Sequence, residues 1–192
     1  MENAKQMILA VDELAKASEE IRVAWEGAVS PEMAREVDAE GAFVNLLGSV
    51  IGQSTSAREK WAQACGLTLD SREEVAPFDP REYHIREFFD NLVYDENGAV
   101  IDRNAHYFDQ YRVNKKLSMV SRRSESIITE SAQAVITAFQ SGASDWGEDL
   151  SALALELLQP ILNDAASLVP MLNMLAEWHE TLMRQNLENC NP

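Results

Sequence analysis

Apolar residues recur at intervals of three and four along most of this chain. The first such seam consists of Met7, Val11, Leu14, Ser18, Ile21, Trp25 and Ala28. Because an α-helix completes a turn every ~3.6 residues, this spacing places the side chains on one face. We therefore predict an amphipathic helix over residues 3–29.

A second helix is predicted over residues 31–65. Ser30 followed by Pro31 is a typical helix start, and Gly66 is a typical stop. The connection between the two helices is short, which favours antiparallel packing. Gly48 and Gly52 lie inside the second helix, and they predict a close approach of a neighbouring helix, with a kink as the alternative.

Residues 66–79 interrupt the helical pattern. Asp79, Pro80 and Glu82 then have the spacing of a helix N-terminus with a capping box. Further along, Asn97-Gly98 between β-prone residues predicts a small β-hairpin over residues 92–101, with a helix–loop–helix corner as the alternative.

The rest of the chain predicts helices over residues 102–140, 145–162 and 168–189, with a linker at 141–144. Pro160 is expected to kink or shorten its helix. The predicted fold is all-α: one helical domain over residues 1–192, a bundle of five to six helices, with a possible sub-boundary at 66–79.

The composition agrees with a globular chain, since 46% of the 192 residues are hydrophobic. The N-terminal residues lack the successive charged, apolar and cleavage regions of a signal peptide, so we expect none here. The longest apolar stretch, residues 41–52, is shorter than the ~20 residues that a membrane span needs. These observations predict a cytoplasmic protein with no membrane association.

Charge is the most distinctive property of the composition. The formal net charge is −16, with 32 acidic and 16 basic residues. Residues 1–98 and 142–192 are acidic, whereas residues 99–141 carry six basic residues against four acidic ones. Such a charge opposes direct binding to nucleic acid and favours a basic protein partner, although solubility alone is a sufficient explanation.

The first two predicted helices carry the candidate partner-binding residues. A dense array of carboxylates on rigid helices imitates a phosphate backbone, and the alternative is an ordinary solvated helix surface. The candidates are Asp12, Glu13, Glu19, Glu20, Glu36 and Glu40.

A basic stripe is predicted on the helix over residues 102–140. At ~100° per residue its members fall within an arc of about 120°, largely opposite the apolar residues. The stripe pairs with an acidic helix of the same molecule or of a second copy, faces solvent, or binds an anion. Its members are Arg112, Lys115, Lys116, Arg122 and Arg123.

No catalytic motif stands out. The chain has no GxSxG, no glycine-rich phosphate loop and no GxGxxG, so we predict no catalytic residues, no metal and no cofactor. The pairs His84/Glu87 and His106/Asp109 have i, i+3 spacing. In antiparallel helices their offset is roughly 8–10 Å along the axis, which argues against a shared metal site.

The sequence thus favours a non-enzymatic acidic helical protein that binds a basic protein partner, as an inhibitor, immunity factor, nucleic-acid mimic or adaptor. Two alternatives stay open. One is a helical metal-dependent hydrolase using His84, Glu87, His106 and Asp109, and the other is a homo-oligomeric assembly component.

Overall fold

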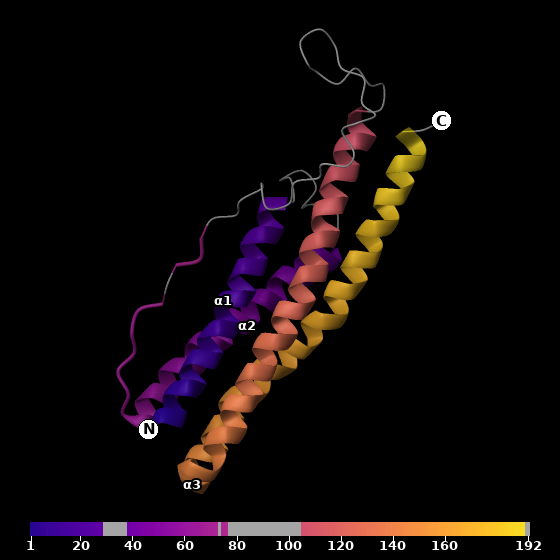
Figure 1. Cartoon of the computed structure of the whole chain (residues 1–192). Helices are drawn as coiled ribbons and strands as arrows, with labels where there is room; N and C mark the ends of the chain where they lie inside the picture. Colours follow the sequence, from indigo (N-terminus) through magenta and orange to yellow (C-terminus); the bar gives the residue numbers. More distant parts are fainter. Residues whose placement is uncertain (29–37, 73, 77–104, 191–192) are drawn as a thin grey trace.

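The structure, a computed structural model, describes residues 1–28, 38–72, 74–76 and 105–190. Within them the chain forms three helices and no strand: α1 (Glu2–Ala28), α2 (Asp38–Cys65) and α3 (Ala105–Cys190) (Figure 1). The all-α class is confirmed. The predicted helix that begins at Pro80 and the predicted hairpin at 92–101 lie outside the described residues.

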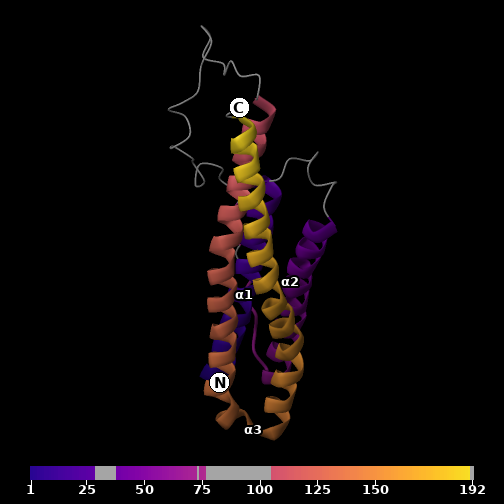
Figure 2. The same ribbon diagram turned by 90° about the vertical axis from the view of Figure 1, so that its right-hand side faces the viewer.

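Helix α3 folds back on itself at Gly147. This residue has φ 74° and ψ 174°, a backbone conformation that only glycine adopts readily. We call residues 105–146 the first arm and residues 148–190 the second arm, and Figure 2 shows them side by side. The predicted linker at 141–144 was wrong, because those residues are helical and the reversal comes at Gly147.

A close contact supports this reversal. Gly142 is buried, and a Cβ at this position would lie 1.9 Å from Cζ2 of Trp146. The indole therefore occupies the space that any larger residue at 142 would need. It also makes edge-on contacts with Trp61 of α2 and Phe139 of the first arm, at ring-centroid distances of 4.7 Å and 6.0 Å.

The expected number of five to six helices was wrong for the part of the chain that the structure describes, which forms three. The second arm runs without interruption through Pro160 and Pro170. Both prolines are exposed, and a helix tolerates a proline best on its solvent side, where water satisfies the carbonyl that loses its hydrogen bond. The boundary predicted between residues 162 and 168 is therefore absent.

Helices α1 and α2 are antiparallel and pack against the α3 hairpin (Figures 1 and 2). The antiparallel register is visible in their contacts. Near the start of α1, Ala4 O accepts a hydrogen bond of 3.0 Å from Trp61 Nε1, near the end of α2. Near the end of α1, the Trp25 ring lies 5.0 Å from the Phe43 ring, near the start of α2.

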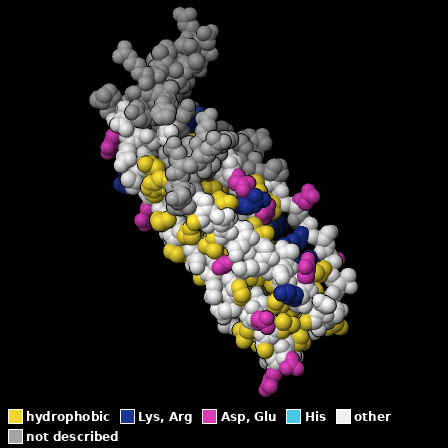
Figure 3. Space-filling model, turned by 180° about the vertical axis from the view of Figure 1, so that it is seen from behind, with side chains coloured by type: hydrophobic (Ala, Val, Ile, Leu, Met, Phe, Trp, Pro, Cys, Tyr) yellow, Lys and Arg dark blue, Asp and Glu magenta, His cyan; other side chains and the backbone are white. Residues whose placement is uncertain are grey.

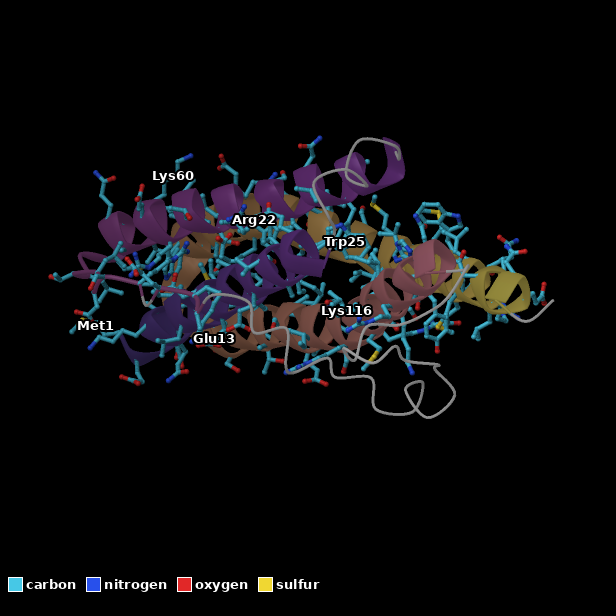
Figure 4. The ribbon with its side chains drawn as sticks, turned by 90° about the horizontal axis from the view of Figure 1, so that it is seen from above. Met1, Glu13, Arg22, Trp25, Lys60 and Lys116 are labelled. Atoms are coloured by element: carbon cyan, nitrogen blue, oxygen red, sulfur yellow. The ribbon has the colours of Figure 1, made fainter. Side chains whose placement is uncertain are left out.

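The core consists of the apolar seams that the periodicity predicts. Figure 4 labels Trp25 inside the bundle, where it is 2% exposed, and Lys60 on the outer side of α2. The largest fully buried side chains come from all three helices: Trp25, Trp61, Phe43, Met7, Leu14, Leu47, Leu117, Ile128, Leu158, Ile161, Leu168 and Leu172.

The predicted role of Gly48 and Gly52 was wrong. Both are exposed, and no atom lies within 4 Å of a Cβ built at either position. Helix α2 buries Phe43, Leu47 and Val50 instead, so its packing face excludes the glycines.

Helix α2 ends at a glycine cap, as expected for Gly66. Gly66 has φ 64°, its N–H donates to Gln63 O at 3.2 Å, and Leu67 N–H donates to Ala62 O at 2.8 Å. This pair of bonds is a Schellman motif. The chain then continues as an extended segment, residues 66–72 and 74–76, which we call the strap (Figure 1).

Candidate functional site

A carboxylate on α1 joins three parts of the chain. Asp12 accepts a hydrogen bond of 2.7 Å from Arg58 Nε on α2 and another of 2.7 Å from Arg72 Nε on the strap. Arg72 Nη1 also donates to Thr55 Oγ1 at 2.7 Å, and Arg58 Nη2 donates to the backbone carbonyl of Asp70. The strap is therefore tied to both helices through charge-assisted hydrogen bonds.

A groove of about 980 Å³ lies between α1 and the strap. This volume is at the upper end of the range for ligand sites, roughly 300–1,000 Å³. Ile8 and Leu9 of α1 and Leu67 and Leu69 of the strap give it apolar walls. Charged side chains of both signs complete the lining, among them Glu13.

The outward face of α1 borders this groove. Glu2, Leu9, Glu13 and Glu20 are all exposed, and at ~100° per residue they fall within an arc of about 40°. Leu9 is 57% exposed and lies between Glu2 and Glu13 on this face. Among the described residues, Glu13 and Glu20 make no ion pair. We call these four residues the α1 stripe.

The other predicted partner-binding residues have different surroundings. Asp12 is held by Arg58 and Arg72 and belongs to the molecule's own contacts. Glu19 contacts Arg22 at 2.5 Å, and this hydrogen bond lowers the pKa of the Glu19 carboxyl. Glu36 lies outside the described residues, as does the side chain of Glu40. The structure therefore brings Glu13 and Glu20 together on one face and separates Asp12 from them.

The predicted basic stripe lies along the first arm of α3. Arg122 is exposed and pairs with Glu180 of the second arm at 3.1 Å, so one member joins the two arms of the hairpin. This bond raises the pKa of Arg122 and lowers the pKa of Glu180. Arg112 and Arg123 are exposed, whereas Lys115 and Lys116 are half-buried, so the five bases do not share one environment. Figure 4 labels Lys116 on the first arm.

The second arm carries a further exposed acidic face. At ~100° per residue its members fall within an arc of about 100°. They are Glu148, Asp149, Glu156, Glu177 and Glu188. In Figure 3 carboxylates are spread along the visible face, with apolar side chains between them.

The structure places the side chain of one thiol, Cys65, and the side chains of several possible metal ligands. Burial raises the pKa of the Cys65 thiol, against a smaller opposing effect of the positive N-terminus, and this disfavours the nucleophilic thiolate. No group of three or more His, Cys, Asp or Glu is placed to hold a metal ion among these residues. His84 and Glu87, with the side chains of His106 and Asp109, lie outside them.

The Asp12–Arg58–Arg72 cluster was not found from the sequence. Its members are 46 and 60 residues apart, and each resembles an ordinary surface charge on its own segment. The groove was missed for the same reason, because its second wall is a non-helical segment whose packing against α1 depends on contacts between residues far apart in the sequence. The acidic face of the second arm could have been found from the sequence, because residues 142–192 contain eight acidic residues and only one basic residue.

One stretch within Gln110–Asn189 is long and apolar enough to cross a membrane by length and composition, and 28% of it is buried in the bundle. A buried core helix meets the same criterion. No protein-family model, curated protein or solved structure matches the chain.

Proposed function

We propose that this protein is a non-enzymatic binding protein that docks a basic protein partner on the outward face of α1. The observation that carries the proposal is the α1 stripe, where Glu13 and Glu20 are exposed and make no ion pair with the other described residues. Carboxylates on a rigid helix attract a basic surface.

The charge of the whole molecule supports the same function. A net charge of −16 speeds the encounter with a basic partner and repels nucleic acid and anionic membranes. The surrounding bundle also suits docking, because α1 is packed on both α2 and α3 and its outward face is held in place. An inhibitor, an immunity factor and an adaptor all use such a surface.

The test is capture of a partner by the tagged protein from its own cells, with nuclease present, followed by binding measurements with the purified pair. The double reversal Glu13→Lys and Glu20→Lys is expected to weaken binding about tenfold or more, because it replaces attraction with repulsion. The matched control, Glu156→Lys with Glu177→Lys, makes the same change of net charge on the second arm.

Equal weakening by both double variants would show that only net charge matters, and it would contradict docking on α1. Recovery of the protein alone or as its own oligomer would contradict a basic partner altogether.

A further inference from the structure

The strap is an extended backbone with unused hydrogen-bonding groups. Within the described part of the chain, no backbone N–H of residues 68–72, 74 or 75 donates a hydrogen bond. The strap is held by side chains instead, through Arg58, Arg72 and Asp12. An extended segment with unpaired N–H groups is a template for another extended chain.

The groove lies beside this template. Its walls offer Ile8, Leu9, Leu67 and Leu69 to apolar side chains. Along the strap, Leu67 and Leu69 are half-buried while Thr68 and Asp70 are exposed, which is the alternation of a strand. An added peptide with the same alternation would place every second side chain in the groove.

Charge selects among such peptides. Glu13, Asp70 and Glu74 line the groove, are exposed and form no ion pair with the described residues. Lys5 is an exposed base in the same lining. The lining as a whole is close to balanced, with five acidic and four basic side chains, so the repulsion of acidic peptides comes from the net charge of −16.

We propose that the groove between α1 and the strap binds an extended segment of the partner that alternates apolar and basic residues and pairs with the strap backbone. This inference rests on the proposed function, because it specifies which part of a basic partner contacts the protein. It adds a recognition mode, backbone pairing, that the α1 stripe alone does not imply.

The probe is a fluorescent peptide of about ten residues that alternates lysine with valine, the length that spans the strap at ~3.3 Å per residue. Its binding to the full chain is measured by fluorescence anisotropy. A second peptide has the same side chains but is N-methylated at alternate residues, so it cannot donate the pairing hydrogen bonds. We expect the methylated peptide to bind at least tenfold more weakly.

A matched pair of variants locates the site. Leu9→Arg fills the groove wall and is expected to weaken binding of the first peptide at least tenfold. Leu155→Arg adds the same charge at a leucine of similar exposure, 51% against 57%, on the second arm of α3. It is expected to leave binding unchanged within twofold. Circular dichroism of both variants checks that the helices are intact.

Hydrogen exchange gives a second readout that does not depend on any variant. The amides of residues 68–72 are expected to exchange fast in the free protein and to slow when the peptide binds. Amides of those residues that are already protected, together with no peptide binding, would show that another segment of the same chain fills the groove, and would overturn the inference.

Equal affinity of the methylated and unmethylated peptides would also overturn it, as would equal weakening by the two leucine variants. The two proposals fail separately. A captured partner that depends on Glu13 and Glu20 but tolerates Leu9→Arg would leave the proposed function standing and remove the groove from it. The opposite result is a peptide that pairs with the strap and a captured partner that binds the Glu13→Lys, Glu20→Lys variant as tightly as the unaltered protein. It would support the groove and contradict docking on the α1 stripe.

Discussion

Asn114 on the first arm of α3 and His179 on the second arm are hydrogen-bonded inside the core, with 2.7 Å between Oδ1 and Nδ1. The Asn114 amide nitrogen donates to Gln110 O at 2.8 Å, which leaves its Oδ1 as an acceptor. His179 Nδ1 is therefore the donor. Both residues are 1% exposed, and the imidazole also contacts the Trp25 ring at 5.7 Å. This bond joins the two arms of α3 within the core.

Replacing Asn114 with alanine leaves the buried His179 N–H without this acceptor. We expect the free energy of unfolding to fall by about 1–3 kcal/mol, the typical cost of an unsatisfied buried donor. Urea denaturation followed by circular dichroism measures the change. Asn163→Ala serves as the control, because Asn163 is an exposed asparagine on the second arm of α3. It is expected to change stability little. Equal losses in both variants would contradict the role of the buried pair.

The reversal of α3 depends on the small size of residue 142. Gly142→Ala places a methyl group on the Trp146 ring, and we expect a loss of about 1–3 kcal/mol through overpacking. Gly48→Ala makes the same substitution in an exposed helical position with open space around it. That variant is expected to gain up to about 1 kcal/mol from helix propensity. Thermal unfolding of the two proteins must therefore shift in opposite directions, and a stabilised Gly142→Ala variant would contradict the packing.

Asp12 holds the strap, so we expect the charge of Asp12 to contribute more to the free energy of unfolding than the charge of Glu13. Asp12→Asn keeps the shape but removes the charge that Arg58 and Arg72 share, and we expect a loss of about 1–2 kcal/mol. Glu13→Gln removes an equal charge from an exposed position and is expected to lie within about 0.5 kcal/mol of the unaltered protein.

Strap mobility gives a second measurement for the Asp12 prediction. Proteolysis within residues 66–76 is expected to accelerate in Asp12→Asn and not in Glu13→Gln. Unchanged proteolysis and stability in Asp12→Asn would mean that the two arginine contacts do not hold the strap.

The Glu19–Arg22 pair predicts a specific pH effect. The hydrogen bond from Arg22 lowers the pKa of Glu19, so the folded state favours the ionised carboxyl. The pair's stabilisation is present above the unfolded-state pKa of glutamate and is lost as the pH falls through the lowered pKa of the folded state. Arg22→Gln is expected to shift the Glu19 carboxyl titration upward, as followed by carbon NMR. An unshifted titration would contradict the cause assigned here.

Several features of this fold follow from local sequence alone. The seam from Met7 to Trp25 predicts α1, and the same residues are buried in the core. Gly66 predicts the end of α2, and it forms the cap. These predictions succeed because helical periodicity and capping depend on residues within one or two turns of each other.

Contacts between distant residues decided the rest. In α2 the expected helix contact at Gly48 and Gly52 is absent, since both glycines are exposed while Phe43 and Leu47 are buried in the core. The reversal of α3 occurs at Gly147 and not at residues 141–144, and the neighbouring Trp146 packs against Gly142 and against Trp61 of α2.

Some features of the candidate site likewise follow from the sequence, and others depend on tertiary contacts. The sequence by itself determined the charge of −16, the helical class and the presence of Glu13 and Glu20 on one helix face, because composition and periodicity need no tertiary information. Only the tertiary structure decided that Asp12 turns inward to Arg58 and Arg72 and that the strap forms a groove along α1. The physical reason is that an ion pair or a groove depends on which segments pack together, and a local pattern carries no record of that choice.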